Sequence, residues 1–129
     1  ALRGWGKLKQ ALTNYYTAAV IKPQDYWAWY QQGVILQQLN RFSEAITYYQ
    51  HALAVVPDAE LARYNIACCY ELLGETAHAL AALEPIIDYY PEIYLPLIES
   101  NPIFETVRQS EQYSFWLENS DKFGKMPNK

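Results

Sequence analysis

Apolar residues recur along this chain at the three- and four-residue spacing that is typical of amphipathic helices. Trp29, Gly33 and Leu36 form one such stripe, which predicts a helix over residues 25–39. A second apolar stripe follows it and predicts another helix that begins near residue 43 and ends before Pro57. Both stripes return further along the chain, so the sequence predicts a series of helical hairpins.

The pattern repeats with a period of 34 residues. Gly6, Asn40 and Gly74 fall in register, and these residue types tolerate the left-handed backbone that a turn between two helices requires. A turn is therefore predicted at each of the three positions. Three further sets agree at the same period: Pro23, Pro57 and Pro91; Ala11, Ala45 and Ala79; and Leu12, Ile46 and Leu80.

The repeated unit resembles the tetratricopeptide repeat (TPR) family, whose pattern is Trp-x2-Leu-Gly-x2-Tyr, then Ala-x3-Phe, then Pro. The resemblance covers about residues 5–91 and implies an all-α fold, a right-handed α-α superhelix or solenoid of antiparallel helical hairpins. Gln32, Arg63 and Leu83 depart from the pattern but leave its spacing intact. The two units read Trp29-x2-Gln32-Gly33-x2-Leu36, Ala45-x3-Tyr49, Pro57 and Arg63-x2-Ile66-Ala67-x2-Tyr70, Ala79-x3-Leu83, Pro91.

The repeat register predicts a TPR domain over residues 1–118 and a flexible tail over residues 119–129. The first unit has only its second helix, so we expect either a fragment of a longer protein or a single helix that caps the stack. At the other end, Asn101-Pro102 starts a new helix, and the apolar residues after it are expected to cover the open end. The domain divides into a half repeat (1–23), two repeats (24–57 and 58–91) and capping helices (92–118) that include Ile103, Phe104 and Val107.

Stacked hairpins form a curved array, and in the TPR family the first helix of each unit lines its concave groove. Asn65 aligns with the asparagine that many family members use to bond a ligand backbone. The alternative for the aromatic residues is packing between hairpins, or cover by the C-terminal helices. The resemblance implies a protein- or peptide-binding surface formed by Trp27, Tyr30, Val34, Gln37, Gln38, Leu61, Tyr64 and Asn65.

The groove residues also indicate the class of ligand. Family members that hold a terminal carboxylate use Lys and Asn on the first groove helix and further basic residues later. Tyr30, Val34 and Leu95 occupy three of those positions here, and only Asn65 matches. We therefore expect a partner segment that is apolar or mixed in character, either helical or extended.

Composition narrows the class of protein further. The 129 residues fit one domain, and a hydrophobic content of 51% supplies a core. The formal charge of -4 argues against a dedicated nucleic-acid binder, and no apolar run is long enough to insert in a membrane. Cys68 and Cys69 are adjacent and poorly placed to bridge, so we interpret them as reduced core residues, which favours a cytoplasmic location.

Catalysis is not predicted. His51 and His78 fall on the outer surface of second helices, without metal-binding spacing, and no glycine-rich phosphate loop is present. We therefore expect no cofactor, no metal and no catalytic residue. The alternative functions are a regulatory module appended to an enzyme, and a structural or homo-oligomeric role through an open N-terminal end that exposes Trp5, Leu8, Leu12 and Tyr15.

Overall fold

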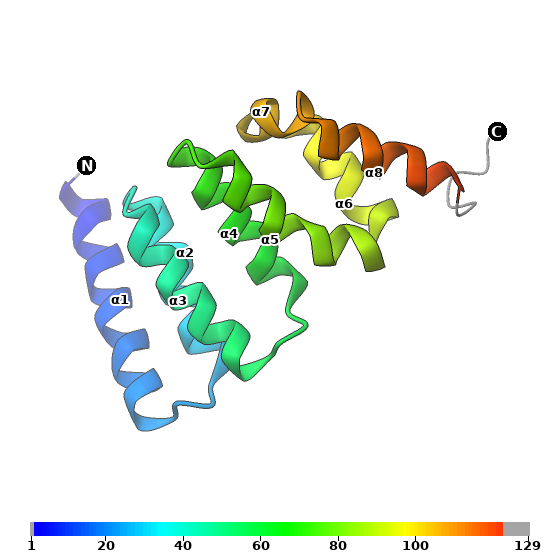
Figure 1. Cartoon of the computed structure of the whole chain (residues 1–129). Helices are drawn as coiled ribbons and strands as arrows, with labels where there is room; N and C mark the ends of the chain where they lie inside the picture. Colours follow the sequence, from blue (N-terminus) through cyan, green and yellow to red (C-terminus); the bar gives the residue numbers. More distant parts are fainter. Residues whose placement is uncertain (1, 123–129) are drawn as a thin grey trace.

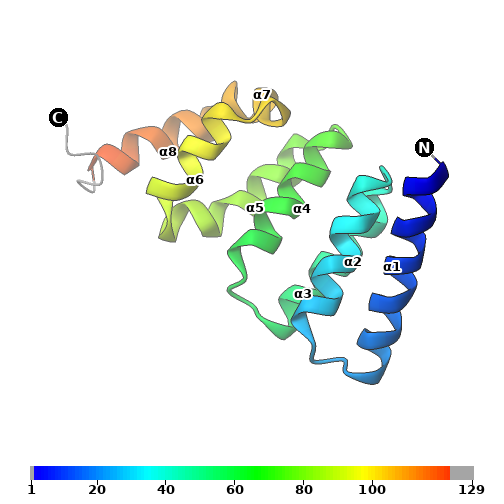
Figure 2. The same ribbon diagram turned by 180° about the vertical axis from the view of Figure 1, so that it is seen from behind.

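The computed structural model describes residues 2–122, and the side chains of residues 6–120. Within residues 2–122 all regular structure is helical and no strand occurs, which confirms the predicted all-α class (Figures 1 and 2). The helices are α1 (Leu2–Ile21), α2 (Tyr26–Gln38), α3 (Phe42–Val55), α4 (Glu60–Leu72), α5 (Thr76–Tyr89), α6 (Pro91–Ser100), the 3₁₀ helix η1 (Pro102–Phe104), α7 (Glu105–Arg108) and α8 (Glu111–Lys122).

The helices lie side by side in chain order, from α1 at one end of the molecule to α6, α7 and α8 at the other (Figure 1). α2 and α3 form one hairpin, and α4 and α5 form the next. α1 packs on α2, and α3 packs on α4, so each hairpin rests on the second helix of the unit before it. This arrangement is the predicted stack of helical hairpins.

The turns within the two hairpins have the same backbone conformation. Asn40 (φ 61°) and Gly74 (φ 78°) adopt the left-handed backbone at equivalent positions. The amide that follows each of them donates to a helix carbonyl, from Arg41 to Leu36 and from Glu75 to Tyr70, both at 2.8 Å. These hydrogen bonds close the helix ends, as the register of these residues predicts.

Gly6 does not make such a turn, so the prediction at this position is wrong. Gly6 lies within α1, with helical residues on both sides of it. A left-handed residue is needed only where the chain reverses between two helices, and no reversal occurs at this point. The period of 34 residues therefore identified the position but not its backbone conformation.

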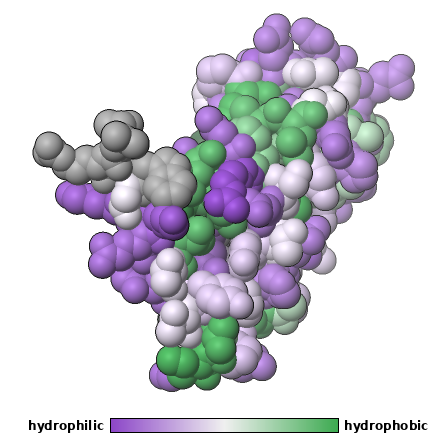
Figure 3. Space-filling model, turned by 90° about the vertical axis from the view of Figure 1, so that its left-hand side faces the viewer, coloured by the Kyte–Doolittle hydropathy of each residue, from purple (hydrophilic) through white to green (hydrophobic). Residues whose placement is uncertain are grey.

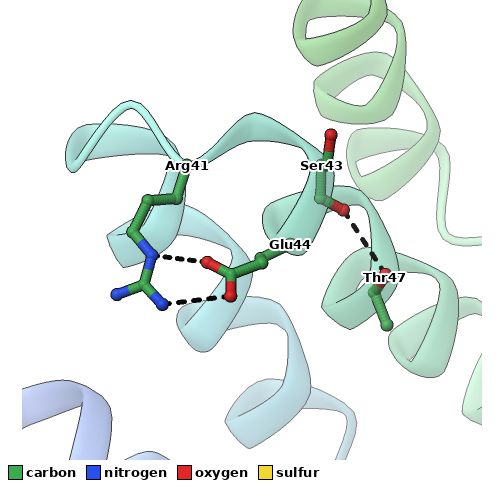
Figure 4. A network of polar contacts seen from close by, with 4 residues as sticks. All are labelled: Arg41, Ser43, Glu44 and Thr47. Carbon is green, nitrogen blue, oxygen red and sulfur yellow. Dashed lines mark hydrogen bonds and ion pairs between the residues drawn. The ribbon is translucent and has the colours of Figure 1, made fainter.

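Local polar contacts stabilise the start of α3 (Figure 4). The Arg41 guanidinium pairs with the Glu44 carboxylate through two hydrogen bonds, one of which joins Nη2 to Oε2 at 3.0 Å. One turn further on, the Thr47 hydroxyl donates to the Ser43 carbonyl oxygen at 3.4 Å. The guanidinium lowers the pKa of the Glu44 carboxyl group through its hydrogen bond, and this favours the charged pair.

The core of the first hairpin depends on a close helix approach at Gly33. A Cβ atom at this position would lie 2.6 Å from Cε1 of the Tyr49 ring, which is fully buried. The second hairpin fills the equivalent space with Ala67 and Leu83, both also fully buried. The bulkier ring of the first hairpin therefore requires the smaller residue opposite it.

Gln32 is a buried polar residue in an otherwise apolar core. Its Nε2 atom donates to the Ala28 carbonyl oxygen at 3.3 Å, but its Oε1 atom is buried without a hydrogen-bond partner in the described part of the chain. Gln32 stands where the TPR pattern has Leu. An acceptor left unsatisfied inside a protein costs about 1–3 kcal/mol.

We expect the substitution Gln32→Met to raise the free energy of unfolding by about 1 kcal/mol, because it keeps the shape and removes the unsatisfied oxygen. The change is measured by urea denaturation, with the circular-dichroism signal of the helices as the readout. Gln50→Met, at an exposed position on α3, is the matched control and should change stability by less than about 0.5 kcal/mol. Destabilisation by Gln32→Met would contradict the view that the Gln32 Oε1 atom is a cost to stability.

The C-terminal helices close the core of the second hairpin. Phe104 and Val107 are completely buried, and they join a cluster that contains residues of α4 and α5 as well as Trp116. The Asn101 side chain accepts a hydrogen bond from the Ile103 amide at 3.1 Å and so starts η1. α8 continues to Lys122, four residues beyond the expected end of the cap.

The N-terminal end is less well covered. Ala11, Tyr15 and Ala18 of α1 are only half-buried, whereas the equivalent residues of α3 and α5 are buried. Leu8 and Leu12, which we expected on the exposed surface, are also half-buried, and the side chain of Trp5 lies outside the described residues. In the complete hairpins this face of the second helix packs on the first helix of the same unit. The half-buried face of α1 therefore corresponds to the face that α3 and α5 bury against the first helix of their own hairpin.

Candidate functional site

Five of the eight predicted contact residues line one open hollow between α2 and α4. Its volume is about 470 Å³. The repeat register brings these residues together, because the two helices present equivalent faces to the same side of the stack. The predicted residues are Tyr30, Val34, Gln37, Gln38 and Asn65, and sequence reasoning missed Asn40, Phe42, Tyr49 and Leu72.

The other three predicted residues lie outside the hollow. Trp27 is 56% exposed and stacks on the Tyr30 ring, with ring centroids 6.0 Å apart. Leu61 is half exposed at the equivalent position of α4. Tyr64 takes part in contacts with the C-terminal helices. Trp27 and Leu61 therefore provide exposed apolar surface on the two helices that form the hollow.

Two hydrogen bonds join the polar groups of the hollow. The Asn65 Nδ2 atom donates to the Tyr30 hydroxyl oxygen at 2.8 Å, and the Tyr49 hydroxyl donates to the Gln37 Oε1 atom at 2.8 Å. The sequence suggested Asn65 as a ligand contact, but its Nδ2 atom already links α4 to α2. Neither the Asn65 Oδ1 atom nor the Gln37 Nε2 atom takes part in these two bonds.

The hollow is electrically neutral. None of its lining residues is acidic or basic. Burial raises the pKa of Tyr30, which is 8% exposed, although the hydrogen bond from Asn65 partly opposes this shift. Burial also raises the pKa of Tyr49 far above its ordinary value. Both phenols therefore stay protonated at neutral pH and act as hydrogen-bonding groups in an uncharged wall.

The C-terminal elements cover the next part of the groove wall. The Tyr64 ring lies 5.6 Å from the rings of Tyr94 and Phe104, measured between centroids. The Asn101 Nδ2 atom donates to the Tyr64 hydroxyl oxygen at 3.0 Å, which repeats the bond between Asn65 and Tyr30 one unit earlier. Tyr64 therefore packs against the C-terminal elements, whereas the hollow between α2 and α4 stays open.

The cysteines have the character of core residues. Cys68 and Cys69 are both buried and free of a disulfide. Burial raises the pKa of each thiol to about 12, so the reactive thiolate is scarce at neutral pH. His51 and His78 lie on α3 and α5, where both are exposed. Within the described residues, no group of three or more metal-binding side chains comes together.

No helix among the described residues has the length and apolar character needed to cross a bilayer. This finding concerns residues 2–122 alone.

Comparison with known proteins extends these observations. The tetratricopeptide repeat pattern matches residues 26–58 and again residues 61–92. The peroxisomal targeting signal receptor of Kluyveromyces lactis is 33% identical over 98 residues, which cover 73% of this chain and 17% of the receptor. The human protein O-mannosyl-transferase TMTC1 is 33% identical over 66 residues, which cover 51% of this chain and 8% of the transferase.

A solved structure of MamA AMB-1 superposes with a TM-score of 0.63 and 26% sequence identity, over 73% of this chain and 52% of that chain. The chain spans less than a third of the length of the curated relatives it matches. The hairpins and their period define an α-helical repeat protein. The chain belongs to the tetratricopeptide repeat family, and its superhelix is the fold of that family. The repeats and these relatives support a protein–protein interaction module.

Proposed function

We propose that the hollow between α2 and α4 binds a segment of a partner protein, and that this chain acts as a non-catalytic docking module. One observation carries the proposal: residues from two consecutive repeats converge on an open, uncharged hollow beside the exposed Trp27. Exposed aromatic surface next to a hollow is typical of a contact site. The buried, protonated cysteines favour a structural role over a catalytic one.

The lining residues suggest how the partner segment is held. Val34, Phe42 and Leu72 offer apolar surface to a side chain that enters the hollow. The amide groups of Gln38 and Asn65 are placed to orient the backbone of the segment by hydrogen bonds. A charged side chain would lose hydration here without gaining an opposite charge, so the ligand is apolar or neutral.

We expect Val34→Asp to weaken binding of a groove ligand by at least about ten-fold, because it places an unpaired charge in the hollow. The probe is a random peptide library displayed on phage, selected on the wild-type chain. Individual synthetic peptides from that selection are then titrated by fluorescence anisotropy. The enriched sequences should be poor in charged residues and should contain a large apolar side chain.

Gln50→Asp is the matched control, since it adds the same charge on the exposed surface of α3 and should leave binding unchanged. Circular dichroism of both variants verifies that the helices persist. If the selected peptides bind Val34→Asp as tightly as wild type, the hollow is not the binding site. Enrichment of acidic C-terminal peptides would contradict the proposed class of ligand.

A further inference from the structure

The outer surface of α1 carries exposed apolar residues that the fold does not require. Tyr16 is 52% exposed and Val20 is 59% exposed. The equivalent positions hold Gln50 and Ala54 in α3, and these face solvent in a complete hairpin. Tyr16 also lines a small hollow with Trp29 and His51, but packing within the stack does not explain an apolar residue at Val20. We call Tyr16, Val20 and the adjacent exposed Ile21 the α1 outer patch.

The α1 outer patch lies in a positively charged part of the chain. Lys22 follows the patch directly and is exposed. Residues 1–24 contain four basic residues and no acidic residue. Lys22 is the basic residue beside the patch, and an apolar surface that carries acidic residues is its best match.

The opposite end of the molecule offers such a surface. A hollow of about 540 Å³ lies between α6 and α8. Leu95, Pro96 and Leu117 form apolar walls, and Leu117 is substantially exposed. Ser120 also lines the hollow; this residue is only 4% exposed, and its hydroxyl has no hydrogen-bond partner in the described part of the chain. We call this hollow the cap hollow.

The cap hollow is acidic. Glu92 and Glu99 line it, and the Tyr113 hydroxyl donates to the Glu99 Oε1 atom at 2.6 Å. Residues 88–120 contain six acidic residues and one basic residue, Arg108. The Nη1 atom of Arg108 donates to the Ile98 and Asn101 carbonyl oxygens at 2.7 and 2.8 Å, so this guanidinium is directed toward the backbone.

We propose that the α1 outer patch of one copy of this chain docks in the cap hollow of a second copy. Val20 and Ile21 meet the apolar walls, and Lys22 comes close to Glu92 and Glu99. The two surfaces differ and lie at opposite ends of the molecule (Figure 1), so the contact is heterologous. A contact of this kind leaves one free surface at each end, and copies add head to tail. The interface does not involve the hollow between α2 and α4.

On the face that Figure 3 views, apolar residues form separate patches between polar ones rather than one continuous apolar area. Small apolar contacts of this kind are weak, and the opposite charges at the two ends supply the selectivity. We therefore expect a reversible association that depends on concentration and on salt.

Sedimentation velocity over a range of protein concentrations tests the proposal. At low salt the wild-type chain should form oligomers whose average size increases with protein concentration. Raising sodium chloride from about 50 mM to about 500 mM should weaken association by about ten-fold, because salt screens the charges at the rim of the contact. Val20→Asp should weaken it by at least about ten-fold, since it puts a negative charge beside an acidic surface.

Each end has a matched control. Ala54→Asp adds the same charge at the equivalent exposed position of α3 and should leave association unchanged. At the other end, Glu92→Lys should weaken association as Val20→Asp does. Glu118→Lys changes the same charge on α8, but Glu118 does not line the cap hollow, so most of the association should remain.

A mixing experiment separates the head-to-tail contact from any symmetric one. The Val20→Asp chain keeps an intact cap hollow, and the Glu92→Lys chain keeps an intact α1 outer patch. Mixed together, the two variants should associate more strongly than either variant alone, because the mixture joins an intact α1 outer patch to an intact cap hollow. Two results would overturn the proposal. One is a wild-type chain that stays monomeric at every concentration. The other is association that neither Val20→Asp nor Glu92→Lys weakens, which would show that the copies use another face.

Discussion

Replacing Phe104 by alanine should lower the free energy of unfolding by about 3–5 kcal/mol, the range measured for large aromatic deletions in protein cores. The ring is completely buried and contacts the Tyr64 ring, so its removal leaves a cavity between η1 and α4. Because native domains are stable by only about 5–15 kcal/mol, this loss is a large fraction of the total. Urea denaturation monitored by circular dichroism measures it.

Phe115→Ala is the control for this experiment. Phe115 is the exposed phenylalanine of α8, and its removal should cost less than about 0.5 kcal/mol. The pair therefore compares the same chemical change at a buried and at an exposed position of the C-terminal cap. If Phe104→Ala cost as little as Phe115→Ala, the C-terminal elements would not be closing the core of the second hairpin.

The second large effect is expected at Gly33. Gly33→Ala should destabilise the chain by about 2 kcal/mol, because the new methyl group overlaps the buried Tyr49 ring and overpacking outweighs the gain in helix propensity. Gly6→Ala makes the same change within α1, where nothing lies within 4 Å of the added atom. That variant should be more stable than wild type by up to about 1 kcal/mol. Thermal or urea unfolding would show the two opposite signs.

A double-mutant cycle shows whether the ring causes the loss at Gly33. Gly33→Ala combined with Tyr49→Leu gives the first hairpin the alanine–leucine pair that the second hairpin has at Ala67 and Leu83. The double variant should lose less stability than the sum of the two single variants, with a coupling of about 1–2 kcal/mol. Simple additivity would mean that the methyl group and the ring do not compete for the same space.

The fold could be predicted from sequence because the information is periodic. The two hairpins bury most of the same positions, so one period and one pair of apolar stripes specify the helices from residue 26 to residue 89. Asn40 and Gly74 followed the same rule, because both stand where a chain reverses. The prediction failed at Gly6, where the register continues but no reversal occurs. The period shows which positions are equivalent in sequence, but it does not show whether the chain reverses at each of them.

The groove was predicted less completely than the fold. Helical spacing identified the face of α2 that carries Tyr30 and Val34, but spacing does not show depth, and Tyr30 is buried. The contacts of Phe42 and Leu72 with the hollow come from the packing of α2 on its neighbours. The bond from Asn101 to Tyr64 joins residues 37 apart, outside the period, so the register gave no signal for it.

The two tyrosine–asparagine hydrogen bonds have a consequence for recognition. The first joins Tyr30 of α2 to Asn65 of α4, and the second joins Tyr64 of α4 to Asn101, which follows α6. A directional bond holds over a narrow range of distances, so it limits how far the wall can flex. In the complex that we propose, the wall of the hollow would be a rigid template, and the conformational entropy lost on binding would fall mainly on the partner segment.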